Sequence, residues 1–155
     1  MVSTGKTKAE LLVDQLLGSW ELVAYTFEVA AGQVYHPLGE DAVGSLVYTP
    51  QHRMSVNIMR SGRKPWASLV PVAGTQAEAA DATAGYLAYS GSFSVDEAAS
   101  AVEHHISVSL FPNWIGDTQR RLVYLSGDEL MLESAAVSDG AGNSGTPRLR
   151  WRRVP

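Results

Sequence analysis

The sequence predicts an all-β fold, a closed antiparallel up-and-down barrel of about eight to nine strands, and three observations lead to it. Short runs rich in aromatic and branched residues recur at intervals of about 8 to 12 residues. Glycine, proline and asparagine turns separate these runs, so the connections are local. The first and last runs both carry a tryptophan, Trp20 and Trp151. Pairing these two strands would remove the free sheet edges, which favours a barrel over a two-sheet sandwich.

Composition limits the classes of function. Residues 1–155 are expected to form one domain, because a chain of this length buries a single core. Hydrophobic residues make up 45% and the net charge is -4, which is typical of a globular protein that does not bind nucleic acid. The absence of cysteine excludes disulfides and thiolate chemistry. No apolar segment near the N-terminus suits a signal peptide or a membrane span, so we expect a cytoplasmic protein with no membrane partner, either a monomer or a homodimer.

Two helices are expected beside the strands. Thr7 to Glu10 and Thr75 to Glu78 both have the spacing of a capping box, which satisfies free N–H groups of a first helical turn. The first box precedes apolar residues at helical spacing and a stop at Gly18, so residues 1–17 are interpreted as an N-terminal extension and helix that packs across an end or flank of the sheet. The second box predicts one inserted helix near residues 75–87.

The remaining periodic segments are predicted strands. They cover residues 21–29, 33–36, 43–49, 54–60, 89–95, 101–111, 118–125, 130–135 and 148–154. A turn is expected at 31–32 and a flexible tip at 138–145. Residues 61–74 contain two prolines and two glycines yet carry Trp66, Leu69 and Val70. A loop with this much apolar area is expected to lie over an opening of the barrel.

Several familiar sequence motifs occur wholly or partly, but without the structural context that their function requires. Gly140 to Gly145 matches G-x-G-x-x-G, but a basic strand follows instead of the helix that a dinucleotide site requires. Gly5-Lys6-Thr7 lacks the earlier glycine and the strand of a phosphate-binding loop, and no G-x-S-x-G elbow occurs. His104 and His105 are neighbours on a strand and point to opposite faces. We therefore expect neither a metal site nor a cofactor.

Polar residues inside barrel-like strands are the better candidates for chemistry. On strand 101–111, His104 shares a face with apolar residues and His105 shares the other with polar ones. On strand 118–125, Arg120 and Arg121 are divided in the same way. One member of each pair faces the lumen and the other faces solvent. Alternation by itself leaves open which one.

The basic C-terminal strand has a structural interpretation. Leu149, Trp151 and Arg153 fall on one face, where Arg153 can stack on Trp20 by a cation–π contact. Trp20, Trp151 and Arg153 are therefore predicted to form the floor of the barrel.

These residues resemble a known family. The matching positions are Leu17 to Val23, Pro37 to Asp41, Gly44, Tyr48 to Pro50, Met54-Ser55, Met59-Arg60, Gly85 to Tyr89, His104-His105, Phe111 to Gly116, Arg121, Leu149, Trp151 and Arg153. The chain resembles the lipocalin-like domain proteins of bacteria and fungi, within the wider calycin group. The resemblance implies a barrel of about eight antiparallel strands whose lumen holds a small, mostly apolar molecule. It also implies a Gly-x-Trp at the closed end with a terminal arginine over the tryptophan.

We accordingly predict that the lumen binds a small, mostly apolar or aromatic molecule. The candidate ligand contacts are Tyr48, Met54, Met59, Trp66, Tyr89, Phe93, Asn113 and Trp114. Some similar barrels of secondary metabolism are cofactor-free cyclases or isomerases, which gives the alternative function: turnover of a polyketide- or polyene-like metabolite. In that case His105 would move a proton, and Arg121 would hold an enolate or carboxylate. Confinement alone could also accelerate a pericyclic step.

Overall fold

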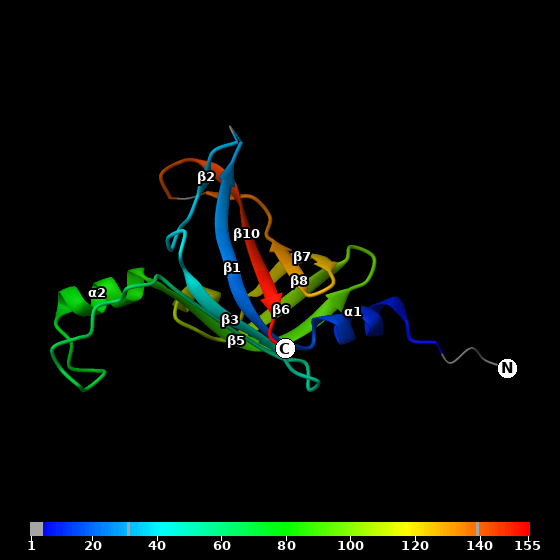
Figure 1. The fold of residues 1–155 in the computed structure, drawn as a ribbon, viewed down its shortest axis with the longest axis horizontal. Coiled ribbons are helices and arrows are strands. Elements are labelled where there is room, and N and C mark those ends of the chain that lie inside the picture. Colours follow the sequence, from blue (N-terminus) through cyan, green and yellow to red (C-terminus); the bar gives the residue numbers. More distant parts are fainter. Residues whose placement is uncertain (1–4, 31, 139) are drawn as a thin grey trace.

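The computed structural model describes residues 5–30, 32–138 and 140–155 (Figure 1). Its helices and strands, in chain order, are α1 (Lys8–Leu16), β1 (Gly18–Val29), β2 (Val34–Tyr35), β3 (Val43–Tyr48), β4 (Arg53–Met59), α2 (Gln76–Ala84), β5 (Tyr86–Asp96), β6 (Ala101–Ser109), the 3-10 helix η1 (Pro112–Trp114), β7 (Thr118–Ser126), β8 (Glu129–Glu133), β9 (Val137–Ser138) and β10 (Ser144–Arg153). Ala31 of the predicted 31–32 turn, Asp139 of the predicted 138–145 tip and residues 1–4 lie outside the described residues.

The strands close into a barrel. Within the described ranges, eight strands follow one another in the order β1, β3, β4, β5, β6, β7, β8, β10, and β10 pairs back onto β1. Every neighbouring pair in this ring is antiparallel. The two-residue strands β2 and β9 extend β1 and β10 outside the ring. The predicted closed up-and-down barrel is confirmed, because the first and last long strands meet along nine residue pairs.

The barrel has two unlike ends. We call "floor" the end where β1 begins and β10 finishes, beside α1, and "mouth" the opposite end, where β2 and β9 lie (Figure 1). Trp20 is fully buried at the floor, and its Nε1 donates a hydrogen bond of 2.9 Å to the carbonyl oxygen of Leu16. The Arg153 guanidinium lies 4.1 Å from the Trp20 ring centre and donates to the carbonyl oxygens of Gln15 and Leu17 at 2.6 and 2.8 Å. These bonds satisfy the free carbonyls at the end of α1 and fasten the helix to the floor.

The lumen is filled in its floor half. Inward side chains of neighbouring strands interlock there, and the largest of them are Trp20, Leu46, Tyr48, Met54, Phe93, Leu130 and Trp151. Tyr48 and Phe93 meet edge to face with ring centres 4.8 Å apart. Among the described residues this half is closely packed, and the inner cavity of the lumen lies in the mouth half.

Helix α2 is shorter than predicted and projects from the side of the barrel. It ends at Ala84, three residues before the predicted limit, because Gly85 terminates it and Tyr86 and Leu87 pair with β4. Figure 1 shows α2 and the preceding loop projecting to one side of the barrel. Trp66 lies there beside Gly74 and α2. No residue from 61–74 lines either hollow of the mouth, and the Trp66 side chain packs against Gly74 and α2 instead, so the expectation that this loop covers the opening is not met.

None of the helices in the described ranges is long and apolar enough to cross a bilayer.

Candidate functional site

The mouth half of the lumen encloses a cavity of about 160 Å³. Strands β1, β4, β5, β7 and β10 supply most of its wall, and η1 and the β8–β9 segment complete it. The lining side chains are Tyr25, Val56, Ile58, Leu87, Tyr89, Trp114, Gln119, Arg121, Ser134, Val137, Pro147 and Leu149. An apolar protein cavity of about 150 Å³ is large enough to hold benzene. The space therefore fits one aromatic ring with small substituents.

A second hollow adjoins this cavity at the mouth. It has a volume of about 390 Å³ and is lined by Tyr25, Phe27, Tyr35, Pro37, Val137, Ser138 and Pro147. Three of these residues, Tyr25, Val137 and Pro147, also line the inner cavity. The two spaces thus meet at a shared wall, and the outer one is where a ligand entering the lumen would pass.

A buried cation faces the inner cavity. Arg121 is only 9% exposed, and its guanidinium donates to the side-chain oxygen of Gln119 at 3.3 and 3.4 Å and to the carbonyl oxygen of Arg120 at 2.9 Å. In the part of the chain that the structure describes, no carboxylate pairs with it. The neighbouring Arg120 lies on the outer face and is paired with Asp96 and Glu103 at 2.8 and 3.0 Å. A buried guanidinium held only by neutral acceptors favours an additional acceptor in the cavity.

Behind the cavity wall, a histidine joins two tyrosines. His104 is 1% exposed, its Nε2 lies 2.7 Å from the hydroxyl oxygen of Tyr48, and its Nδ1 lies 3.0 Å from that of Tyr89. Burial, reinforced by the positive charge of Arg121, lowers the pKa of His104 to about 3. Burial also raises the pKa values of Tyr48 and Tyr89. Near neutral pH the three side chains are therefore uncharged and linked by hydrogen bonds.

Comparison with known proteins identifies the family. A family model described as a lipocalin-like domain matches residues 17–154. The chain belongs to the lipocalin-like domain family. It is also 38% identical, over 108 residues, to the 4'-hydroxy-3'-methoxypropiophenone carrier protein of Aspergillus oryzae. That match covers 66% of this chain and 97% of the relative. The barrel and its likeness to a carrier protein support small-molecule binding as the general class of function.

The histidine that faces the lumen of this lipocalin-like barrel is His104, and the choice of His105 is wrong. His105 lies on the outer face, where its Nε2 meets the Ser94 hydroxyl at 2.8 Å and its Nδ1 meets the Thr118 hydroxyl at 3.0 Å. The β6–β7 register sets this orientation, since it places His104 opposite Gln119 on the face that also carries Arg121. His105 and Arg121 consequently do not share a cavity. The acid–base pair of the alternative function is not assembled.

The predicted ligand contacts are divided between five environments. Tyr89 and Trp114 line the cavity, edge to face with ring centres 5.5 Å apart. Tyr48, Met54 and Phe93 point inward but belong to the packed floor half. Met59 lies on the outer face, because it pairs with Tyr86, whose hydroxyl meets Asn57 outside the barrel. Asn113 is exposed on η1, and Trp66 lies beside α2.

Tyr25 lines the cavity, although the alternation of residues along its strand predicts that it points outward. Counting from the inward Trp20 in steps of two places Ala24 inside and Tyr25 outside. A β-bulge between Leu22 and Ala24 inserts one extra residue and reverses this order, so that Tyr25 points into the lumen opposite Leu149. An exposed Val23 in an otherwise half-buried run is the local signal of the bulge. It is visible only once burial is known.

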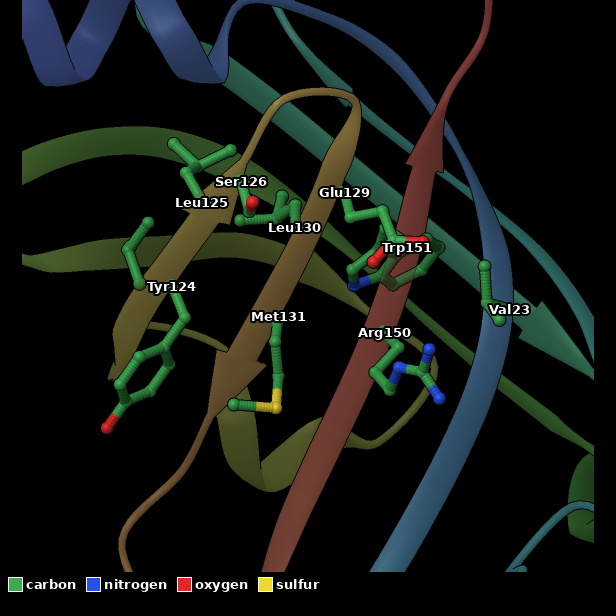
Figure 2. Close-up of a pocket in the computed structure, with 10 residues that line it drawn as sticks. Val23, Tyr124, Leu125, Ser126, Glu129, Leu130, Met131, Arg150 and Trp151 are labelled. Atoms are coloured by element: carbon green, nitrogen blue, oxygen red, sulfur yellow. The ribbon is translucent and has the colours of Figure 1, made fainter.

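A shallow depression of about 430 Å³ also occurs on the outside of the lipocalin-like barrel (Figure 2). Tyr124, Met131 and Arg150 lie side by side on β7, β8 and β10 there. Alternate residues of the same strands, such as Leu130 and Trp151, point into the core. The sheet therefore separates this outer depression from the lumen.

Within the described ranges no three histidine, aspartate or glutamate side chains gather in a way that could hold a metal ion.

Proposed function

We propose that this lipocalin-like barrel is a carrier for a compact aromatic molecule that bears an oxygen acceptor. The observation that carries the proposal is the cavity in the mouth half of the lumen, apolar over most of its wall and containing the guanidinium of Arg121 without a carboxylate partner. Such a site gives a ligand both an apolar surface to bury and a charged hydrogen-bond donor to orient it. Neither feature alone would be specific.

The shape of the wall supports an aromatic ring. Val56, Ile58 and Leu87 provide aliphatic surface, while Tyr89 and Trp114 offer two aromatic faces. Aromatic groups prefer offset or edge-to-face contacts, which add about 0.5–1.5 kcal/mol to the burial of their area. A flat ring between these side chains would satisfy that preference. The ligand's oxygen would then lie toward Gln119 and Arg121 on β7.

The relative from Aspergillus oryzae supports the same class of ligand. Its name describes a carrier of 4'-hydroxy-3'-methoxypropiophenone, a single aromatic ring with a ketone, a hydroxyl and a methoxy group. A molecule of this kind suits a cavity of about 160 Å³ that adjoins a larger hollow at the mouth. We propose small aryl ketones and related oxygenated single-ring compounds as the ligand class of the present protein.

The alternative, a cofactor-free cyclase or isomerase for a polyketide- or polyene-like metabolite, has weaker support. The inner cavity suits one ring and not a long folded chain. Among the described residues that line it there is no aspartate, glutamate or histidine to move a proton. His104 lies behind Tyr89, and its low pKa makes it a poor base near neutral pH. The size and the lining of the cavity therefore support a carrier better than an enzyme.

The test compares two adjacent arginines. Titration calorimetry with 4'-hydroxy-3'-methoxypropiophenone is expected to show binding to the unaltered protein. Arg121→Met is expected to weaken it roughly 10- to 100-fold, because a charged hydrogen bond contributes about 1.5–3 kcal/mol. Arg120→Met, on the outer face, is the matched control and should leave Kd within about twofold.

Two results would overturn the proposal. One is failure of the unaltered protein to bind any member of a panel of single-ring ketones, phenols and aromatic acids. The other is an equal loss of affinity in Arg120→Met and Arg121→Met, which would mean that the buried guanidinium has no special contact with the ligand. Circular dichroism of both variants establishes that the barrel is folded before binding is compared.

A further inference from the structure

The hydrogen bonds of His104 determine the direction in which Tyr89 donates. A neutral imidazole has one N–H donor and one acceptor nitrogen. His104 is neutral near pH 7, because its pKa is lowered to about 3. Its two partners are both tyrosine hydroxyls, Tyr48 on Nε2 and Tyr89 on Nδ1. One hydroxyl must therefore donate to the ring, and the other must accept from it.

Tyr48 decides between the two arrangements. It is almost completely buried, and within the described residues its hydroxyl has one hydrogen-bond partner, Nε2 of His104 at 2.7 Å. If Nε2 carried the proton, the Tyr48 hydroxyl would accept it and its own proton would be buried without an acceptor, which is strongly unfavourable. Tyr48 therefore donates to Nε2. The ring proton of His104 then sits on Nδ1 and is donated to the hydroxyl oxygen of Tyr89.

The oxygen of Tyr89 is consequently used as an acceptor. It receives Nδ1–H of His104, and the positive charge of Arg121 opposes the rise that burial causes in the pKa of Tyr89. A phenol oxygen has two acceptor sites and one proton. The proton of Tyr89 is thus the group left over, and both Tyr89 and Arg121 line the inner cavity.

We infer that the Tyr89 hydroxyl and the Arg121 guanidinium form a pair of donors that binds one carbonyl oxygen of the ligand. The inference rests on the proposed function and assigns the recognised group: a neutral ketone or aldehyde next to an aromatic ring. A carbonyl oxygen accepts two hydrogen bonds and brings no proton of its own. The corresponding alcohol brings a proton that would need an acceptor in the same place. The side-chain oxygen of Gln119, an acceptor in the cavity wall, is already occupied by Arg121.

A set of three isosteric ligands tests the donor pair. Propiophenone, 1-phenyl-1-propanol and propylbenzene share a ring and a three-carbon chain and differ at one position. The ketone is expected to bind about tenfold more tightly than the alcohol and tighter still than the hydrocarbon. Binding of none of the three, nor of the hydroxy-methoxy ketone used above, would refute the proposed function. Equal binding of all three would leave a binding site in place and refute the donor pair alone.

Tyr89→Phe removes the hydroxyl and retains the ring. We expect the preference for ketone over hydrocarbon to fall about 3- to 10-fold in this variant, with affinity for propylbenzene unchanged. Tyr124→Phe is the matched control, because Tyr124 is an exposed tyrosine on the outer face of β7. The infrared carbonyl band of bound propiophenone should shift to lower frequency in the unaltered protein and in Tyr124→Phe, and less in Tyr89→Phe. An identical band in all three proteins would contradict the inference.

A measurement on the unliganded, unaltered protein is independent of the variants. Nitrogen-15 NMR distinguishes the two neutral tautomers of a histidine, and the His104 signal can be assigned by its loss in His104→Gln. We expect the Nδ1-protonated form. Observation of the Nε2-protonated form would reverse the chain of hydrogen bonds, direct the Tyr89 proton to the ring and refute the inference.

Discussion

Acid is expected to destabilise the barrel through His104 before it affects the carboxylates. The ordinary histidine pKa of 6.5 applies to the unfolded chain, whereas burial lowers the pKa of His104 to about 3 in the folded protein. Between these two values the unfolded state binds more protons, so stability rises with pH and is lost as pH falls. At about 1.4 kcal/mol per pH unit, the unfolding free energy should decrease by roughly 2.5 kcal/mol between about pH 7 and pH 4.5.

The choice of pH window isolates the histidine. Hydrogen bonds from Arg120 and from a backbone N–H lower the pKa of Asp96, so its contribution is present above the ordinary aspartate value of 3.8 and disappears below it. Measurements that stop at about pH 4.5 therefore exclude most of the carboxylate contribution. Urea unfolding followed by tryptophan fluorescence gives the free energy at each pH. The proteins are compared by the slope of unfolding free energy against pH. A substitution that lowers stability equally at every pH therefore does not affect the comparison.

The two adjacent histidines make the comparison specific. His104→Gln cannot be protonated, and we expect it to lose most of the pH dependence in this window. His105→Gln alters the outer face, retains His104 and should keep the full dependence. An equal slope in the unaltered protein and in His104→Gln would refute the argument. So would an NMR titration in which His104 changes charge near pH 6.5.

Three further predictions concern the floor, a second β-bulge, between Ser90 and Gly91 where β5 pairs with β6, and ligand binding. Arg153→Met should lower the unfolding free energy by about 2–3 kcal/mol, because the carbonyls at the end of α1 lose charged donors. Arg152 is the exposed neighbour of Arg153, and Arg152→Met should lower the unfolding free energy by less than about 0.5 kcal/mol. Similar losses in both variants would contradict a stabilising role of the Arg153 contacts at the floor. Gly91→Ala should be severely destabilising by thermal unfolding, since a Cβ would lie 1.8 Å from the carbonyl oxygen of His105; an unchanged Tm would contradict this. A ligand at about 100 times its Kd should stabilise the protein by about 2.7 kcal/mol, and at the same concentration the gain should be much smaller in Arg121→Met.

The fold could be predicted because its signals are local and independent of side-chain packing. Both capping boxes form as expected, at Thr7 and at Thr75. Turn residues separate strands whose bounds differ from the predicted ones by at most four residues, because helix and strand ends depend on pairing as well as on composition. Closure of the barrel was predicted because the first and last strands both carry a tryptophan, and the pairing of β1 with β10 confirms it. Stacking of Arg153 on Trp20 also occurs as the alternation of the last strand indicated.

The site was harder to predict because it depends on which face of each strand is inside. The face of strand 101–111 that carries His105 was open to two interpretations, a solvent face or a polar lumen wall, and the structure makes it the outer face. His104 shares its face with Val102 and Ile106, and these apolar neighbours correctly indicate that His104 points into the barrel. Arg121 shares its face with Val123 in the same way. The β-bulges in β1 and between β5 and β6 shift the alternation by one residue, and no periodicity in the sequence shows them.

The electrostatics of the lumen explain why a single cation can remain there without a carboxylate. A paired acid would neutralise Arg121 but would also compete with any ligand for its N–H groups. In the described structure Gln119 and a backbone carbonyl hold the guanidinium instead, and burial keeps His104, Tyr48 and Tyr89 uncharged around it. Neutral acceptors orient the guanidinium without cancelling its charge. A ligand carbonyl then meets donors that are already in position, so that little reorganisation opposes binding. The same arrangement disfavours a second cation in the cavity, and for this reason a positively charged amine analogue of the ligand should not bind.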